Sequence, residues 1–407
     1  MKRRHFLALG GLAASLHFLS GKVWASPLSR QSQAPRLLVV LLRGAYDGAN
    51  LLVPHGYPFY YASRPSIALA RPNPDDPKAV LDIGQGYGLH PAVSSSLYAL
   101  FQQQQALLVP FSGSADVSRS HFQAQDVMEL GQNPQGRLDY ASGFLNRLAE
   151  ILNRGNPRLG GISFTPSLTL AFKGKINVPN ISLKGQVRDI PNDRSTRLLA
   201  ALYQGSRLGD YVNEGIQTRH QVSAELEKEM RDASRGAAKA TGFNKEVRSM
   251  AALMRDNPAY TLGFAEVGGW DTHVNQGAAS GPLATNLENL AQGLSSFADE
   301  LGPAAWRQTV VAVMSEFGRT FRENGNRGTD HGHGNTLWVL GGGISGGKLA
   351  GELIDVSEKT LFQNRDFPVL NDYRAVLSHL AQRMYGLSPA QLDRLFPGIR
   401  PGNLGII

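Results

Sequence analysis

Apolar residues are distributed along the chain in short continuous runs separated by longer amphipathic stretches. Residues 37–42, "LLVVLL", are apolar at every position, which is typical of a strand buried on both faces between helices. Comparable strand-length runs follow at 106–110, 260–269, 309–318 and 336–343. Helical patterns separate most of them, at 91–105, 284–302 and 372–385. Strands that alternate with helices predict an α/β fold with a mostly parallel central sheet flanked by helices.

The pattern changes between about 195 and 256, where charged residues and strong helix formers dominate and β-branched residues are few. We interpret this segment as a helical insertion packed on one side of the sheet, because it has no strand-like runs that would give it a core of its own. The sequence contains no internal repeat. We therefore predict a single α/β domain over residues 36–407, preceded by a polar linker at 26–35, "SPLSRQSQAP".

The first 25 residues have the features of an export signal. The segment "MKRRHFLALGGLAASLHFLSGKVWAS" combines a basic start, an apolar stretch and a small-residue cleavage signal. Its "RRHFL" run resembles a twin-arginine leader, which implies export of the folded protein to the periplasm or beyond. The alternative is an uncleaved anchor, but the apolar stretch is short for a membrane span and is interrupted by Gly10, Gly11 and His17. We expect no stable membrane span after processing.

Charge and cysteine content narrow the classes of function. The formal net charge of +8 includes Lys2, Arg3, Arg4 and Lys22 of the leader, so the processed chain would carry +4. This modest balance suits an anionic ligand and gives no specific case for a nucleic-acid partner. The absence of cysteine excludes disulfides, thiolate metal sites, cysteine nucleophiles and iron–sulfur clusters.

Residues with catalytic or metal-binding chemistry gather at the ends of the predicted strands, where open α/β sheets bind their ligands. Four of the eight histidines outside the leader belong to this group. Mixed carboxylates and imidazoles favour zinc, manganese or iron over calcium. The candidates are Asp47, Ser120, His121, Asp271, His273, Glu316, Asp330, His331 and His333.

Two of these candidates also fit purely structural roles. Asp47 in "YDGAN" could be a turn residue, since Asp-Gly is a common turn dipeptide. Ser120 and Gln123 match a capping box that opens a helix over 121–130. A nucleophilic role for Ser120 is compatible with that position, because a helix N-terminus also favours a bound anion.

The other candidates have structural alternatives as well. The "DTH" segment at Asp271–His273 could cap a loop, and Glu316 with Arg319 could form a structural ion pair. His90 in "GLHPAV" is expected to anchor a turn before a helix. His220 and His379 lie in helical patterns and are expected to have no special role.

Seven segments together carry a resemblance to a known family. They are "LLRGAYDGAN", "GLHPAV", "RSHFQAQD", "GGWDTH", "SEFGRT", "GTDHGHGN" and "LGGGISGGKLAG", which run in order over most of the chain. As a set they resemble the bacterial "domain of unknown function 1501" family, which looks related to the alkaline phosphatase superfamily that includes the sulfatases. The resemblance implies a parallel sheet with two divalent metal ions at its strand ends.

The resemblance also implies roles for single residues. Asp47 would be the carboxylate after the first strand, and Ser120 would be the hydroxyl nucleophile at a helix start. Arg119 or Arg319 would hold the oxygens of a phosphate or sulfate ester, because a guanidinium fork matches that geometry. Where the superfamily has an adjacent Asp-His pair this chain has "EF", so one imidazole is missing. The implied metal ligands are Asp47, Asp271, His273, Glu316, Asp330, His331 and His333.

Two functions of different classes follow from this reading. The first is an exported metal-dependent hydrolase of phosphate or sulfate esters, with zinc expected and manganese or iron as alternatives. The second is a non-catalytic binding or assembly protein of the envelope that keeps the fold and part of the metal site. The "RENGNRG" segment at 322–328 is expected to be a lid or a turn beside the site.

Overall fold

The computed structural model describes residues 34–154, 160–182, 198, 200–206, 208–217, 243–402 and 404–407. The predicted leader at 1–25 and most of the predicted linker lie outside the described residues. In the part of the chain that is described, no helix has the length and apolar character that a membrane crossing requires.

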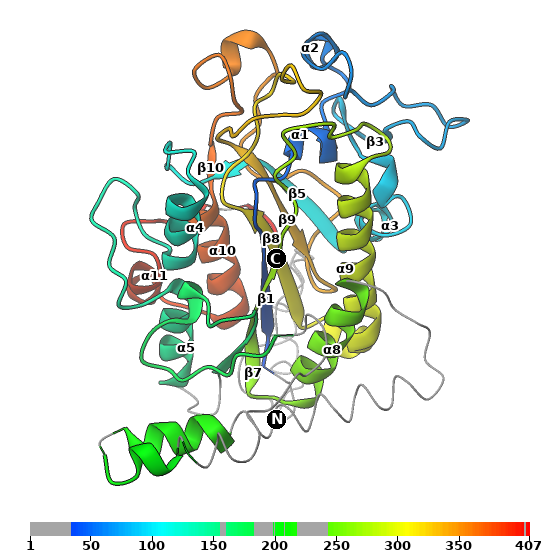
Figure 1. Cartoon of the computed structure of the whole chain (residues 1–407). Helices are drawn as coiled ribbons and strands as arrows, with labels where there is room; N and C mark the ends of the chain where they lie inside the picture. Colours follow the sequence, from blue (N-terminus) through cyan, green and yellow to red (C-terminus); the bar gives the residue numbers. More distant parts are fainter. Residues whose placement is uncertain are drawn as a thin grey trace, which may run out of the picture.

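A seven-stranded sheet forms the centre of the molecule, with the strand order β10-β5-β9-β8-β1-β7-β6 (Figure 1). Strand β1 occupies the middle and pairs in parallel with both β7 and β8. Strand β6 pairs in parallel with β7, and β10 in parallel with β5. The strands are β1 (Arg36–Leu42), β5 (Ala106–Gly113), β6 (Gly160–Phe164), β7 (Tyr260–Val267), β8 (Thr309–Ser315), β9 (Asn335–Leu340) and β10 (Asn371–Asp372).

Strand β9 runs antiparallel to both of its neighbours, β5 and β8. It follows β8 without an intervening helix, as an antiparallel connection permits. The prediction of a mostly parallel sheet flanked by helices is confirmed, and β9 is the exception that makes the sheet mixed. Because β9 is reversed, the residues that precede it lie at the same edge as the residues that follow β1, β7 and β8.

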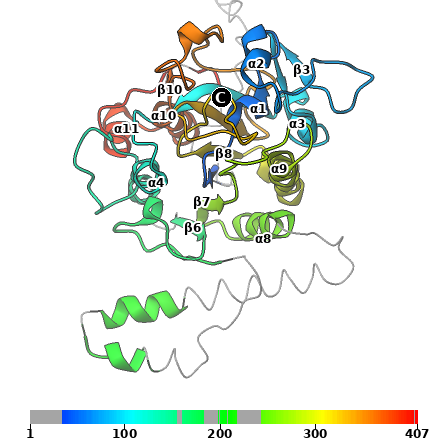
Figure 2. The ribbon, with the colours of Figure 1, turned by 45° about the horizontal axis from the view of Figure 1, so that its top comes forward.

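Helices cover both faces of the sheet. Figure 2 shows α8 and α9 on one side and α4, α10 and α11 on the other. In β1 the alternate residues Leu38, Val40 and Leu42 join the core under α8 and α9, whereas residues 37, 39 and 41 join the core on the opposite face. This explains the continuous apolar run, since a strand between two helical layers has no polar face.

The helices that the structure describes are mostly short. They are α1 (Gly48–Leu51), α2 (Pro58–Ser63), α3 (Leu97–Gln102), α4 (His121–Leu130), α5 (Phe144–Asn153), α8 (Phe243–Asp256), α9 (Pro282–Trp306), α10 (Tyr373–Tyr385) and α11 (Pro389–Leu395), with 3-10 turns η1 (Pro91–Val93), η2 (Leu170–Phe172) and η3 (Glu358–Thr360). The helix predicted over 91–105 is wrong in its extent, because Ser96 has non-helical backbone angles and separates η1 from α3. Gly302, with φ 74°, interrupts α9 near its end.

Outside the central sheet, β2 (Leu52–Val53), β4 (Tyr87–Leu89) and β3 (Leu81–Gly84) form a small antiparallel sheet. The described parts of the predicted 195–256 insertion contain helix at 200–203, at 209–217 and in α8, which packs on α9. The division of the chain into a signal, a linker and a single domain stays a prediction.

Candidate metal centre

Five connections meet at one edge of the central sheet. The segments after β1, β7 and β8 leave the sheet there, α4 begins there after β5, and the chain enters β9 there. Parallel neighbours bring the ends of β1, β7 and β8 into register. The sequence therefore places its acids and imidazoles on different loops, and the sheet brings those loops together.

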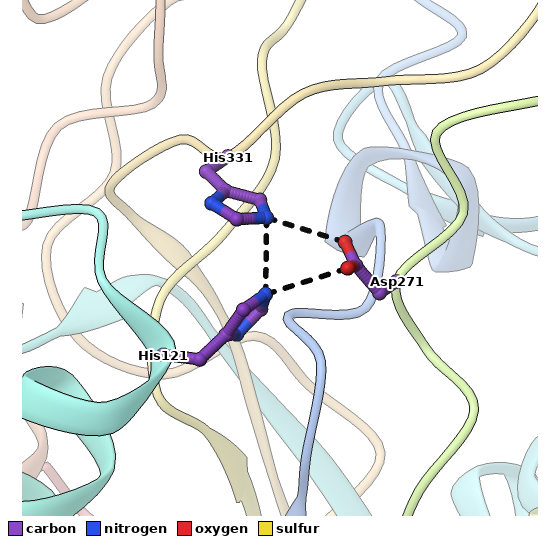
Figure 3. A group of neighbouring side chains, drawn as sticks. All are labelled: His121, Asp271 and His331. Carbon is purple, nitrogen blue, oxygen red and sulfur yellow. Dashed lines mark hydrogen bonds and ion pairs between the residues drawn. The ribbon is translucent and has the colours of Figure 1, made fainter.

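Three side chains from three of these loops converge. His121 opens α4, Asp271 follows β7 and His331 precedes β9, and their ligand atoms all lie within 4.8 Å of one another (Figure 3). The Nε2 atoms of His121 and His331 are 3.0 Å apart. Asp271 lies 3.3 Å from His331 Nε2 through Oδ1 and 3.6 Å from His121 Nε2 through Oδ2. This donor set fits a divalent transition metal.

A fourth side chain adjoins this group. His273 Nε2 is 2.8 Å from Asp271 Oδ1 and 3.1 Å from His331 Nε2. We refer to His121, Asp271, His273 and His331 as the His–Asp cluster. Its members keep between a quarter and a half of their side-chain surface exposed, so the cluster is open to ligands.

The other ring nitrogen of each histidine has a partner. Nδ1 of His121 is 2.8 Å from Glu316 Oε1, Nδ1 of His331 is 2.9 Å from the backbone oxygen of Arg119, and Nδ1 of His273 is 3.0 Å from Asp330 Oδ1. These partners only accept, so each Nδ1 carries a proton and donates it. When such a ring is neutral, its lone pair is on Nε2, inside the cluster. Metal-binding histidines are held by acceptors in this way.

Glu316 is the most extensively bonded of these acceptors. It is buried, and its carboxylate accepts hydrogen bonds from the backbone N–H groups of Gly44 (2.8 Å) and Ala45 (3.2 Å), from the Ser315 hydroxyl and from Gln125. Burial alone would raise the pKa of Glu316, but the bonds from His121, Gln125 and Gly44 outweigh it, so the pKa is lowered. Glu316 therefore stays ionised and orients His121.

The same contact acts on His121. The hydrogen bond to Glu316 raises the pKa of His121 above its ordinary value, although partial burial opposes it. For His331 the balance is reversed, because burial lowers its pKa and the hydrogen bond to the Arg119 carbonyl only partly offsets this. The two rings in contact thus differ in their affinity for a proton.

Asp271 is held by Arg319. The guanidinium donates from Nη1 to Asp271 Oδ1 at 2.7 Å, and the Arg319 side chain is fully buried. Burial would raise the pKa of Asp271, but the hydrogen bond and charge of Arg319 lower it. The structural ion pair considered for Glu316 and Arg319 is therefore wrong, because the partner of Arg319 is Asp271.

Two glycines make the convergence sterically possible. Gly44 has φ +116°, and a Cβ there would lie 2.8 Å from the backbone nitrogen of Asp271. A Cβ on Gly332 would lie 2.4 Å from the backbone carbon of Arg319. The loops after β1 and β8 can approach the loops that carry the cluster only because these side chains are absent.

Asp47 does not reach the cluster. It is buried, caps α1 by accepting from the Ala49 N–H at 3.2 Å, and forms an ion pair with the buried guanidinium of Arg64. Gln276 also donates to its carboxylate, at 2.6 Å. The sequence left a turn role open for Asp47; the structure instead makes it the N-cap of α1 and gives it a positive partner in Arg64.

The segment that opens α4 departs from expectation. Ser120 is the N-cap residue, but its side chain makes no capping bond, and Gln123 lies 3.5 Å from Asp116 instead, so the capping box is wrong. Arg119 has φ +52°, and its guanidinium bonds the buried carboxylate of Asp366 at 2.7 Å. Both arginines expected to hold an ester oxyanion are thus paired with carboxylates.

The residues before β9 separate into two groups. His331 points into the cluster, whereas His333 is buried and packs on Phe362, with ring centroids 4.7 Å apart. Burial lowers the pKa of His333. Asp330 orients His273 and also accepts from Asn324 at 3.0 Å. Asp330 and His333 are therefore not among the converging ligand atoms.

The "RENGNRG" segment is a turn packed against the loop of His273. Asn324 accepts from the backbone N–H groups of Asn326 and Gly328 and donates to the His273 carbonyl at 3.0 Å. The turn interpretation is confirmed. His90 caps η1 by accepting from the Ala92 N–H at 3.0 Å, in line with the predicted anchoring role before a helix. Its Nε2 also bonds the Ala278 carbonyl, which the sequence did not predict.

His121 is the member of the cluster that the sequence did not assign to the metal. It stood among the strand-end histidines, but the resemblance directed attention to Ser120 beside it. The sequence nevertheless contained a signal for His121. Glu316 in "SEFG" needs hydrogen-bond donors, and His121 and Gln125 of "RSHFQAQ" lie on one helical face and supply them.

Comparisons with known proteins identify a family and distant structural likenesses. The sequence model of the family described as "Protein of unknown function (DUF1501)" matches residues 34–396. No curated protein matches the chain. Solved structures with some likeness include the lipoteichoic acid synthase LtaP from Listeria monocytogenes, at 8% identity and a TM-score of 0.38, covering 92% of this chain and 76% of that one.

Two further solved structures show the same level of likeness. One is Ps i-CgsB, at 10% identity and a TM-score of 0.38, with 91% of this chain and 78% of that chain covered. The other is BT1596, a 2-O GAG sulfatase, at 10% identity and a TM-score of 0.36, with coverage of 91% and 76%. Likenesses this distant assign no activity.

Proposed function

This chain belongs to the family of proteins of unknown function DUF1501, and we propose that it is an exported metal-dependent hydrolase of phosphate or sulfate esters. The proposal places one divalent ion in the His–Asp cluster, with His121, Asp271 and His331 as its ligands. Zinc is the expected ion, with manganese or iron as alternatives, because two imidazoles and one carboxylate suit borderline metals.

One arrangement of side chains is the main support for the proposed metal site. Three histidines from separate loops each have Nδ1 bonded to a fixed acceptor, and their Nε2 lone pairs face one carboxylate. Without a cation, lone pairs and a carboxylate at such short range would repel one another unless protons intervened. A metal ion bound there would supply positive charge beside a bound anionic ester.

The proposed chemistry of the chain itself involves Ser120 and His273. Ser120 adjoins His121, is half-buried, and has a hydroxyl that is not used as a cap, so we assign it the attack on phosphorus or sulfur. The hydroxyl proton would pass to Nε2 of His273, the most exposed of the three imidazoles, which Asp330 holds by its Nδ1–H. The imidazolium of His273 would return that proton to the leaving alkoxide and so release the alcohol, and a water molecule would then hydrolyse the ester formed on Ser120.

We propose a single ion where the family resemblance implied two. The second set of ligands would be Asp47 and Glu316, but Asp47 is neutralised by Arg64 and Glu316 is surrounded by hydrogen-bond donors. We propose that Arg64 occupies the electrostatic role of a second cation. Arg64 is buried and holds Asp47 in place.

A second candidate is a non-catalytic binding protein of the envelope. The observation in its favour is that both arginines expected to hold a transferring group are paired with carboxylates, Arg119 with Asp366 and Arg319 with Asp271. Such a protein would keep the metal and bind an anionic partner without turning it over.

The test is turnover of aryl phosphate and aryl sulfate by the metal-loaded, leader-free protein. We expect hydrolysis of at least one class, lost in Ser120→Ala and in His273→Ala, and retained in Ser95→Ala, which changes an exposed serine after η1. Absence of turnover in a protein that holds its metal would overturn the hydrolase and leave the binding function.

A further inference from the structure

Three large apolar side chains stand exposed beside the His–Asp cluster. Phe122 directly follows His121 and is 87% exposed, Val274 directly follows His273 and is 58% exposed, and Val117 is 51% exposed in the segment before α4. In the part of the chain that the structure describes, eleven large apolar side chains are exposed, and these three are the most exposed of those outside residues 198–211. We call them the apolar rim.

Val117 and Phe122 lie on one stretch of chain that leads into the cluster. Asp116 accepts from the backbone and hydroxyl of Ser118 and lies 3.5 Å from Gln123 of α4. These contacts hold the segment of Val117 against the first helical turn, which carries Phe122. Both residues thus stand beside the point where His121 enters the cluster.

Val274 lies on a different loop, after β7, and this loop is also held by hydrogen bonds. The Asn275 N–H bonds the Asn326 carbonyl at 2.9 Å, and Asn324 bonds the His273 carbonyl. Arg119 and Asn275 both have positive φ, 52° and 49°, in the two segments that present the rim. The loops therefore hold their apolar side chains in water by specific backbone geometry.

A single exposed apolar side chain on a surface needs no explanation, but three on the segments that form one charged site indicate a binding surface. Burying a phenylalanine or valine side chain is favourable by roughly 1.5–3 kcal/mol, so a ligand that covers the rim gains affinity. The ligand must also place an anion at the cation site formed by the neighbouring histidines. Few chemistries other than an amphiphile meet both requirements.

We propose that the substrate is a small amphiphilic ester, with its anionic phosphate or sulfate at the metal and its apolar alkyl or aryl group on Phe122, Val117 and Val274. The inference rests on the proposed metal function and adds the substrate class. The rim determines the apolar part of the substrate, and the cluster determines its charge.

The experiment measures binding of linear alkylphosphonates, from methyl to hexyl, to the zinc-loaded protein by calorimetry, below the concentrations at which they aggregate. Affinity is expected to rise by up to about fourfold per methylene for the carbons that the rim covers. Phe122→Ser and Val274→Ser should flatten this dependence and leave methylphosphonate affinity unchanged. Leu168→Ser, on the segment between β6 and η2, is the matched control and should keep the dependence.

The outcomes separate this inference from the proposed function. An affinity that does not change with chain length overturns the apolar rim alone. Failure of methylphosphonate to bind while longer chains bind overturns the anion site and keeps the rim. A flat series combined with Phe122-dependent sedimentation on phosphatidylglycerol vesicles would make the rim a membrane contact and overturn the substrate proposal.

Discussion

The Nε2 atoms of His121 and His331 lie 3.0 Å apart, and the Nδ1 atom of each ring is hydrogen-bonded to an acceptor. Both Nδ1 atoms carry protons, so the facing Nε2 atoms can share only one proton between them. The raised pKa of His121 and the lowered pKa of His331 assign that proton to His121 in the metal-free protein. A bound cation would take its place.

Metal binding at a pH below the raised pKa of His121 should therefore release about one proton per ion, because the cation requires both lone pairs. The sign follows from the pKa shift: His121 with a raised pKa holds its proton to higher pH, so metal affinity falls as pH falls through that value. Calorimetric titration in buffers of different ionisation enthalpy measures the released protons. Binding without proton release would contradict the shared-proton arrangement.

Glu316→Gln tests the orientation of His121. The amide keeps the shape of the side chain but removes the charge and turns a donor toward groups that already donate. We expect zinc affinity to fall by about 10- to 100-fold, as for other residues that hold a metal-binding histidine. Competition with a zinc-binding dye measures the affinity. Glu358→Gln, an exposed partner of Arg322, should bind zinc like the unmodified protein.

Asp47→Asn distinguishes a structural ion pair from a metal ligand. Arg64 would be left buried without its charged partner, and breaking such a pair costs about 3–5 kcal/mol in free energy of unfolding. Denaturant unfolding measures the loss. The folded variant should retain a full equivalent of metal, and a folded variant that has lost its metal would restore Asp47 to the ligand set.

His333→Ala separates the two histidines of "HGH". His333 packs on Phe362 in a buried site, so its removal leaves a cavity and lowers the thermal unfolding midpoint. We expect metal content, measured on the purified protein, to remain that of the unmodified chain. Loss of metal in a variant that still folds would mean that His333 takes part in the site.

The main strands could be predicted from the sequence because they are apolar on both faces, and β1 shows this most clearly. Strand β6 could not, since glycine and serine occupy three of its five positions and it lies at the sheet edge. Nor does the pattern reveal the reversed direction of β9, which depends on its pairing with β5 and β8. Because β9 is reversed, the residues before it lie at the site and the residues after it do not.

Candidate site residues could be found from their place along the chain, but their partners could not. Asp271 and His331 were identified by position, and the structure brings them together. The role of Asp47 depends on Arg64, 17 residues further on, and no local pattern predicts that contact. Glu316 is saturated by N–H groups that point at it only once the loop after β1 has folded.

The most direct test is the zinc stoichiometry of the metal-stripped, leader-free protein, measured with its His331→Ala variant and with His55→Ala as the control. His55 pairs with Asp82 outside the cluster. We predict one equivalent in the unmodified protein and in the control, with none in His331→Ala, whose thermal midpoint no longer rises with added zinc. Unchanged zinc binding by His331→Ala would contradict the metal centre.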